Sequence, residues 1–192
     1  HAQHGRNFAF FDAPVGMIAV KAPGPGVHPY SLAVDGPGVR LKDEGVLVAA
    51  DWDVVVFNSP VDPREDIAAW RTATEQDGAV RTRTRALTLS YGYKGPSDVL
   101  PAAKDRGIGR DRFGMIATTS LKLDAGGWVI STLSDDGVRV TVDGKAVVEN
   151  WTHHGPTRDS SKFSLDKPRE VNITVEHFEL DVRDTKLGEE EL

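Results

Sequence analysis

The sequence predicts an all-β protein, an antiparallel β-sandwich or barrel with one short helix near residues 63–74. Three observations lead to this prediction. Segments rich in β-branched residues follow one another at short intervals from residue 53 to residue 180. Gly, Pro and Asp-Gly turn signals separate these segments. A helix-start signal followed by apolar residues at helical spacing occurs near residue 63. Many short strands and one helix are typical of an antiparallel sandwich.

Composition excludes several classes of protein. The 192-residue chain has a net charge of −6, whereas a nucleic-acid binder carries a basic surface, so no nucleic-acid partner is expected. No apolar run approaches the ~20 residues that a membrane-spanning helix needs, so no membrane span is expected. The chain has no cysteine, which excludes disulfides, thiolate metal sites and cysteine nucleophiles.

The first 50 residues differ from the rest. Short apolar runs at residues 8–11 and 17–20 precede two stretches rich in Pro and Gly, APGPGVHP and DGPGVR. We predict that residues 1–50 form an N-terminal strand or linker segment, which joins or packs on another domain or mediates self-association. Residues 51–192 are predicted to form the β-sandwich.

The predicted helix lies in DPREDIAAWRTA, after a strand at DVVVF, residues 53–57. Asp62 is a candidate N-cap, Pro63 stands at the first helical position, and Glu65 completes a capping box. Apolar spacing then predicts a helical face formed by Ile67, Trp70 and Thr74. We interpret Trp70 as a core residue, because aromatic residues at helical spacing are usually buried.

The stretch VRTRTRALTLSYGY, residues 80–93, alternates with a period of two and predicts a strand. Arg81, Arg83 and Arg85 extend the face formed by the alternate residues Leu87, Leu89, Tyr91 and Tyr93. The favoured interpretation is a strand that runs past the sheet edge into solvent, and the alternative is an anion-binding stripe. The next stretch, residues 95–114, is predicted to be a long polar loop. Its Gly107 and Gly109 do not form a dinucleotide fingerprint, because Arg112 replaces the third glycine.

The remaining strands are predicted at MIATTSLKL, WVISTL, VRVTVD, KAVVENW, KFSL and VNITVEHFEL. Asp143-Gly144 between two of them is a strong hairpin signal. His177 shares the parity of the apolar residues in its strand, so we predict a buried, hydrogen-bonded histidine.

The motif SDDGVRVTVDGKAVVENW, residues 134–151, resembles the PA14 family, and the resemblance extends over residues 51–180. LTLSYGYKGPSD and DRFGMIATTSLKLDAGGWVISTLSDDG resemble the family upstream of the motif, and WTHHGPTRDSSKFSL and VNITVEHFEL do so downstream. The resemblance implies a lectin-like β-sandwich or barrel module of a secreted or cell-surface protein. It also implies a non-catalytic role in binding a glycan or polysaccharide.

The resemblance implies a possible calcium site at Asp135 and Asp136. In the calcium-dependent branch of the family, an adjacent aspartate pair joined by a cis peptide binds the ion, and the ion binds sugar hydroxyls. Calcium takes six to eight oxygen ligands, so carboxylates are suitable chemistry. The alternative is a structural turn, in which one aspartate caps the turn, the other forms a local hydrogen bond, and Gly137 supplies a positive φ.

Trp151 and His154 are the other predicted carbohydrate contacts, since aromatic faces stack on sugar rings and histidines supply hydrogen bonds. Trp151 closes a strand, so a core position is the alternative for it. The N-terminal His1 raises the separate idea of copper chelation, with His4 or His28 as a second ring. No nucleophile elbow or zinc-protease helix is present, so no enzyme is predicted. The main competing function is a structural or assembly module without a small ligand.

Overall fold

The computed structural model of the protein describes residues 22–89 and 92–180. Its strands are β1 (Gly26–Gly36), β2 (Val39–Ala49), β3 (Trp52–Asn58), β4 (Val80–Thr84), β5 (Phe113–Leu123), β6 (Gly126–Ser134), β7 (Val138–Val142), β8 (Lys145–Asn150), β9 (Thr157–Leu165) and β10 (Arg169–Glu179). Its helices are α1 (Ile67–Thr72), α2 (Pro101–Asp105) and the 3-10 segments η1 (Ala73–Glu75) and η2 (Gly92–Asp98). The predicted all-β antiparallel class is confirmed.

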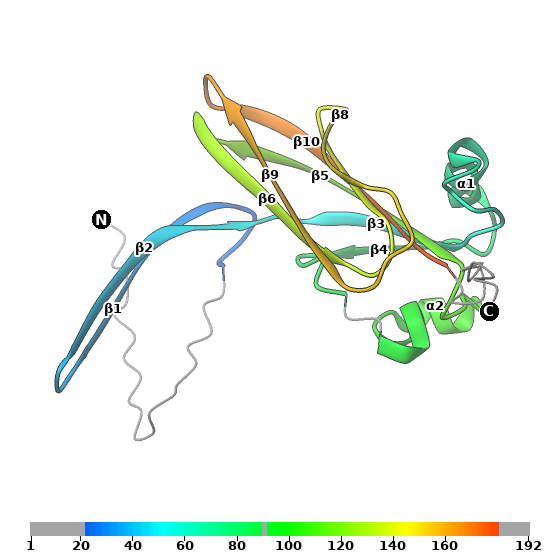
Figure 1. Ribbon diagram of the computed structural model, residues 1–192, viewed down its shortest axis with the longest axis horizontal. Helices are drawn as coiled ribbons and strands as arrows, with labels where there is room; N and C mark the ends of the chain where they lie inside the picture. Colours follow the sequence, from blue (N-terminus) through cyan, green and yellow to red (C-terminus); the bar gives the residue numbers. More distant parts are fainter. Residues whose placement is uncertain (1–21, 90–91, 181–192) are drawn as a thin grey trace, which may run out of the picture.

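The central element is a six-stranded antiparallel sheet with the strand order β4-β3-β5-β10-β7-β8. A second, two-stranded sheet of β6 and β9 lies across this sheet and makes the other layer of the sandwich (Figure 1). A third pair, β1 and β2, forms a long ribbon that projects away from the sandwich (Figure 1).

Alternation along the strands divides the core between the two faces of the large sheet. One face is apolar along β5, β7 and β10, and the inward side chains of the β6–β9 sheet, Trp128, Ile130 and Phe163, pack against it. The other face contributes Phe57 and Phe178, which pack with Trp70 of α1. Trp70 is fully buried, so its predicted core position is confirmed.

The helix α1 is present where the sequence predicted it, but it begins later and has a different cap. Asp66 is the N-cap, and its Oδ1 accepts the backbone N–H of Ala69 at 2.9 Å. The predicted cap, Asp62, instead holds a turn before the helix, where its Oδ1 accepts the N–H of Arg64 at 2.8 Å. Asp62 and Asp66 have the same type of side chain, which can cap a helix N-terminus. Because residues 62–66 form a turn, the helix begins about one turn later than predicted.

The predicted strand over residues 80–93 is shorter than expected, because β4 ends at Thr84. Leu87 and Leu89 follow it without strand geometry and pack on the core. Tyr91 and the side chain of Tyr93 lie outside the described part of the chain. The prediction of a long polar loop over residues 95–114 was incomplete, because this stretch contains part of η2 and the whole of α2.

The arginines of this stretch are engaged with nearby oxygen atoms. Arg83 Nε lies 3.5 Å from Asp53 Oδ1, and Arg85 Nε lies 3.3 Å from Asp51 Oδ1. Arg81 Nη2 donates to the Thr74 carbonyl at 2.9 Å. This arrangement agrees with a charged edge strand, because β4 is an outer strand of the sheet.

The Asp143-Gly144 hairpin is confirmed between β7 and β8. Both residues have positive φ, 49° and 79°, as a type I′ turn requires. The Asp143 carboxylate also binds β10, since it accepts the backbone N–H of Asn172 at 2.9 Å and contacts Arg169 at 2.5 Å. The hairpin is thereby fixed to the neighbouring strand.

The N-terminal region contains more structure than the sequence indicated. Residues 26–49 form the β1–β2 ribbon, and the Pro-Gly pair at residues 37–38 makes its turn, with a φ of 76° at Gly38. The apolar runs at residues 8–11 and 17–20 lie outside the described residues, as do His1 and His4. The division of the chain at residue 50 stays a prediction. In the described ranges, no helix has the length and apolar character needed to cross a membrane.

Candidate functional site

The aspartate pair lies at one end of the sandwich, where three segments meet. These are the β6–β7 connection at residues 135–137, the β8–β9 connection at residues 151–156, and the end of β10. The Gly137 carbonyl accepts the backbone N–H of Phe178 at 3.1 Å, which joins the first segment to β10. Bonds from the Asp136 carboxylate join all three.

Asp136 is an internal anchor of this end. Its side chain is buried, with 1% of the residue exposed. Oδ1 accepts the backbone N–H of His154 at 2.9 Å, and Oδ2 accepts that of Leu180 at 2.8 Å. A buried carboxylate with two such bonds is well satisfied, and it fixes the positions of both partner segments. The structural interpretation of this aspartate is therefore supported, although its bonds are long-range and not local.

Gly137 does not have the positive φ that the turn interpretation predicted. The glycine is required by packing, because a Cβ at this position would lie 2.1 Å from Cε1 of Phe178. His177, also in β10, places its ring Nδ1 3.2 Å from the Gly137 carbonyl and is 7% exposed. Its predicted burial and hydrogen bonding are confirmed.

Asp135 is the exposed member of the pair. Partial burial is the main cause that raises the pKa of the Asp135 carboxyl above its usual value, and the neighbouring charge of Asp136 adds to it. His153 and His154 act in the opposite direction on the same pKa, which places both histidines within electrostatic reach. The peptide bonds of the described residues are all trans, so the two aspartates are not joined by a cis bond.

The two histidines after Trp151 have different environments. His153 Nε2 lies 3.7 Å from Asp136 Oδ1, and its side chain is 25% exposed. His154 bonds through Nδ1 to the Gly155 carbonyl at 2.8 Å. Since a carbonyl can only accept, Nδ1 carries the proton and Nε2 is left as an acceptor. That Nε2 is buried and has no hydrogen-bond partner in the described part of the chain.

Glu179, at the end of β10, belongs to the same region, and sequence reasoning missed it. Burial raises its pKa to about 8, and the charges of Asp136, Asp135 and Asp111 act in the same direction. The carboxyl is therefore mostly protonated at neutral pH. Burial also lowers the pKa of His177, to about 4. Perturbed pKa values concentrated at one end of a domain are typical of functional sites.

Trp151 is packed inside the domain more than the sugar-stacking prediction assumed. Its ring makes edge contacts with Trp70 and Phe178, at centroid distances of 5.5 and 4.8 Å. Its Nε1 donates to the Pro63 carbonyl at 3.2 Å. The guanidinium of Arg139 lies 4.7 Å from the ring centroid. These contacts agree with the core alternative, and they leave little of the ring for a sugar.

The residues present do not form an evident calcium site. Calcium takes six to eight oxygens, and both oxygens of Asp136 already accept backbone N–H groups. Among the described residues, no group of three or more His, Asp or Glu side chains is arranged to hold a metal ion. Calcium binding by Asp135 and Asp136 stays a prediction that this geometry does not favour.

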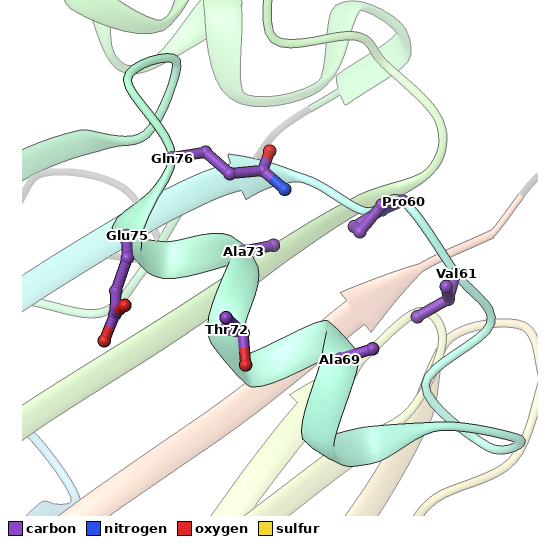
Figure 2. A pocket seen from close by; sticks show the side chains of 7 residues that line it. All are labelled: Pro60, Val61, Ala69, Thr72, Ala73, Glu75 and Gln76. Carbon is purple, nitrogen blue, oxygen red and sulfur yellow. The ribbon is translucent and has the colours of Figure 1, made fainter.

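A shallow groove of about 620 Å³ lies elsewhere, beside α1 (Figure 2). It is lined by Pro60, Val61, Ala69, Thr72, Ala73, Glu75 and Gln76. Figure 2 shows Gln76 pointing across the groove toward Pro60, whereas Glu75 points away from it. Its mainly apolar walls lack an aromatic face, so the groove is less suited to a sugar than the loop region is.

Comparison with known proteins agrees with the resemblance to the PA14 family that the motif at residues 134–151 predicted. The family model of the PA14 domain matches residues 98–188. No curated protein matches the chain. One similar solved structure is an anti-sigma factor domain-containing protein, with 19% identity and a TM-score of 0.48 over 67% of this chain and 38% of that one.

Two other similar structures are PA14 domains. The PA14 domain of the antifreeze protein MpAFP has 18% identity and a TM-score of 0.45 over 66% of this chain and 72% of that one. The PA14 sugar-binding domain from an RTX adhesin has 18% identity and a TM-score of 0.44 over 67% of this chain and 81% of that one. The family match begins at residue 98, whereas the predicted resemblance began at residue 51. The match nevertheless includes the aspartate motif, so residues 98–188 are similar to the PA14 domain.

Proposed function

We propose that this chain is a non-catalytic carbohydrate-binding module whose ligand contacts lie at the end of the sandwich that Asp136 organises. The observation that carries the proposal is that the exposed carboxylate of Asp135 lies within electrostatic reach of His153 and His154, on loops that the buried Asp136 carboxylate joins. The PA14 match over the same loops supports it.

The chemistry of this end suits sugar hydroxyl groups. Asp135 offers two acceptor oxygens, and a carboxylate makes stronger hydrogen bonds than a neutral acceptor. His153 can donate or accept through a partly exposed ring. Asp136 fixes the backbone of the His153–His154 loop by accepting the N–H of His154, so this loop loses little conformational entropy when a ligand binds.

A glycan ligand also favours a secreted or cell-surface location, which forms part of the same proposal. We do not assign a catalytic step, because the role of each residue at this end is explained by anchoring or by hydrogen bonding. Calcium is not required in this proposal, because the Asp135 carboxylate can accept hydrogen bonds from sugar hydroxyl groups directly.

The test is a glycan-array profile of the full chain, followed by titration of the strongest glycan. We expect Asp135→Ala to weaken binding at least about 10-fold, in line with the loss of one charged hydrogen bond worth ~1.5–3 kcal/mol. The matched control is Asp124→Ala, an exposed aspartate that precedes β6 at the opposite end of the sandwich. If both variants bind as the original chain does, the assigned site is wrong.

A further inference from the structure

The large apolar side chains that are exposed in the described part of the chain gather in two places. Two of them, Val129 and Leu133, belong to β6 and are 58% and 64% exposed. The others all lie on the β1–β2 ribbon: Tyr30, Val34, Val39, Leu41, Val46 and Val48. Exposed apolar side chains that gather on one surface mark an interaction site. The chain therefore has two such surfaces.

The first surface is one face of the ribbon. Directly opposed residues of an antiparallel pair share a face, and Val34 is opposite Leu41, whereas Ala33 is opposite Lys42 on the other side. The face that contains Val34 is called the apolar face below, and its apolar members are Tyr30, Leu32, Val34, Val39, Leu41 and Leu47. On the other side, the outer half of the ribbon has charged residues that form ion pairs, Arg40–Asp35 and Lys42–Glu44.

The second surface is the outer face of the β6–β9 sheet. Trp128, Ile130 and Phe163 of this sheet pack on the core, so the alternate residues point outward. These outward residues are all exposed, and they are Gly127, Val129, Ser131, Leu133, Arg158, Ser160, Lys162 and Ser164. Most of them are small, and such a face can receive another sheet at the ~10 Å spacing of packed sheets.

The charges of the two surfaces are opposite in sign. The outer face of the β6–β9 sheet carries Arg158 and Lys162 and no acidic side chain. The apolar face of the ribbon carries Asp43 and no lysine or arginine. The Tyr30 hydroxyl donates to Asp43 Oδ2 at 3.0 Å, which holds this carboxylate in place. Complementary charge favours contact between these two surfaces and disfavours contact of either surface with itself.

We propose that the chain forms a dimer by reciprocal exchange of ribbons, in which the apolar face of each ribbon lies on the outer face of the β6–β9 sheet of the other copy. Within one chain the ribbon projects away from its own sandwich (Figure 1), and both Leu41 and Leu133 are exposed. A twofold axis makes the two contacts of the dimer equivalent, as in most homo-oligomers.

The areas of the two surfaces favour an exchange over a single contact. The ribbon has 11 residues in each strand and is roughly 37 Å long and about 10 Å wide, whereas β6 has 9 residues and its sheet is roughly 31 Å long. One contact therefore buries at most about 310 Å² on each copy, and an exchange buries about 620 Å². Only the exchange brings the total, about 1,240 Å², into the ~1,200–2,000 Å² range of stable interfaces.

Face-to-face pairing of two ribbons is the competing arrangement, and three observations argue against it. It would bury about 370 Å² on each copy, less than half of the ~800 Å² per partner in a stable complex. It would leave Val129 and Leu133 exposed. It would also place the Asp43 side chains of both copies in one interface, where like charges repel each other.

The first test is sedimentation of the full chain over a range of concentrations, without any glycan. We expect a monomer–dimer equilibrium in which the dimer is the main species at about 100 μM. A chain that stays monomeric at this concentration, or one that forms ever longer polymers, would overturn the proposal. This measurement uses the original chain, so it does not depend on the folding of any variant.

Substitutions on the two surfaces then test which faces meet. Leu41→Glu and Leu133→Glu should each weaken the dimer at least about tenfold, because each places a charge in an apolar contact. The matched control is Ala33→Glu, on the opposite side of the ribbon, which should change dimerisation by less than about twofold. A loss in Leu41→Glu alone would show that ribbons pair with ribbons, and an equal loss in Ala33→Glu would exclude the apolar face. Either result would overturn the proposal.

Cross-linking of mixed chains identifies the contact directly, since the original chain has no cysteine. Leu41→Cys chains are mixed with Leu133→Cys chains and treated with a short bismaleimide, and mass spectrometry identifies the products. The Leu41–Leu133 product should exceed the Leu41–Leu41 product at least about fivefold, because the exchange keeps the two ribbons apart. A larger share of Leu41–Leu41, or no product between chains, would contradict the exchange. None of these measurements depends on glycan binding.

Discussion

Leu180 donates its backbone N–H to Oδ2 of Asp136 at 2.8 Å, although the two residues are 44 positions apart in the sequence. The other oxygen of the same carboxylate accepts the N–H of His154. A single buried side chain thus joins the loop before β7, the loop before β9 and the end of β10. The loop residues that we assign to ligand binding depend on this anchor for their position.

Asp136→Ala should therefore lower the free energy of unfolding by about 3 kcal/mol, since two buried N–H groups lose their acceptor and each costs ~1–3 kcal/mol. Urea denaturation measures this change. Asp135→Ala is the matched control, and as a surface substitution it should change stability by less than about 0.5 kcal/mol. Equal losses in the two variants would contradict the anchoring role.

Stability should fall as the pH rises from 6.5 to 8. Glu179 has a pKa of about 8 in the folded protein and an ordinary value of 4.5, so the folded state binds its proton more tightly and loses stability between these pH values. His177 has a pKa of about 4 and an ordinary value of 6.5, so its contribution rises with pH over that range. The two contributions oppose each other below pH 6.5. Above it the contribution of His177 fades, and the loss due to Glu179 dominates.

Thermal unfolding at a series of pH values tests this prediction. The original chain should lose stability between pH 6.5 and 8, by less than the full pKa shift implies, because Glu179 is partly exposed and solvent screens its interactions. Glu179→Gln should remove most of this loss, because the amide does not titrate. A Glu179→Gln variant that keeps the full loss would show that another group is responsible.

Gly137→Ala should destabilise the protein by at least about 1–3 kcal/mol, because overpacking of a filled core costs this much. The added methyl group would overlap the ring of Phe178, as the 2.1 Å contact shows. Gly155→Ala in the facing loop is the matched control, since a Cβ there meets nothing within 4 Å. Chemical denaturation of the two variants gives the comparison, and a neutral Gly137→Ala would mean that the loop yields easily.

Arg71→Met should lower the free energy of unfolding by about 2 kcal/mol or more, because it removes the main partner of a buried carboxylate. Arg71 Nε lies 2.6 Å from Oε1 of Glu176, whose side chain is only 6% exposed. The control is Arg83→Met, which removes an exposed pair with Asp53 and should cost less than about 0.5 kcal/mol. Similar unfolding free energies for the two variants would show that Arg139, whose Nη1 lies 3.5 Å from Glu176 Oε2, satisfies the carboxylate without Arg71.

The strands from β5 to β10 could be predicted from the sequence because their signals are local. Alternation of apolar residues fixes which side of a strand is buried, and Asp143-Gly144 defines a hairpin by its own backbone preferences. The burial of Trp70 and His177 followed from the same periodicity. These features do not depend on distant parts of the chain.

The features that could not be predicted depend on distant contacts. Asp136 and Asp135 are identical in type and adjacent, and only the backbone donors 18 and 44 positions away distinguish the buried anchor from the exposed residue. The same holds for Glu179, whose pKa depends on carboxylates of other segments. The ribbon was missed because Pro and Gly around it resemble an irregular linker, although its alternating YSLAV and VLV stretches are a usable signal.

The most direct test of the account is to measure glycan binding by the full chain and by Asp135→Ala and Asp124→Ala, each in calcium and in a chelator. The account predicts that the original chain and Asp124→Ala bind equally in both buffers, and that Asp135→Ala loses at least about 10-fold in affinity. Loss of binding in the chelator alone would restore the calcium prediction for Asp135 and Asp136. Binding by none of the three proteins, or equal binding by all three, would contradict the central claim.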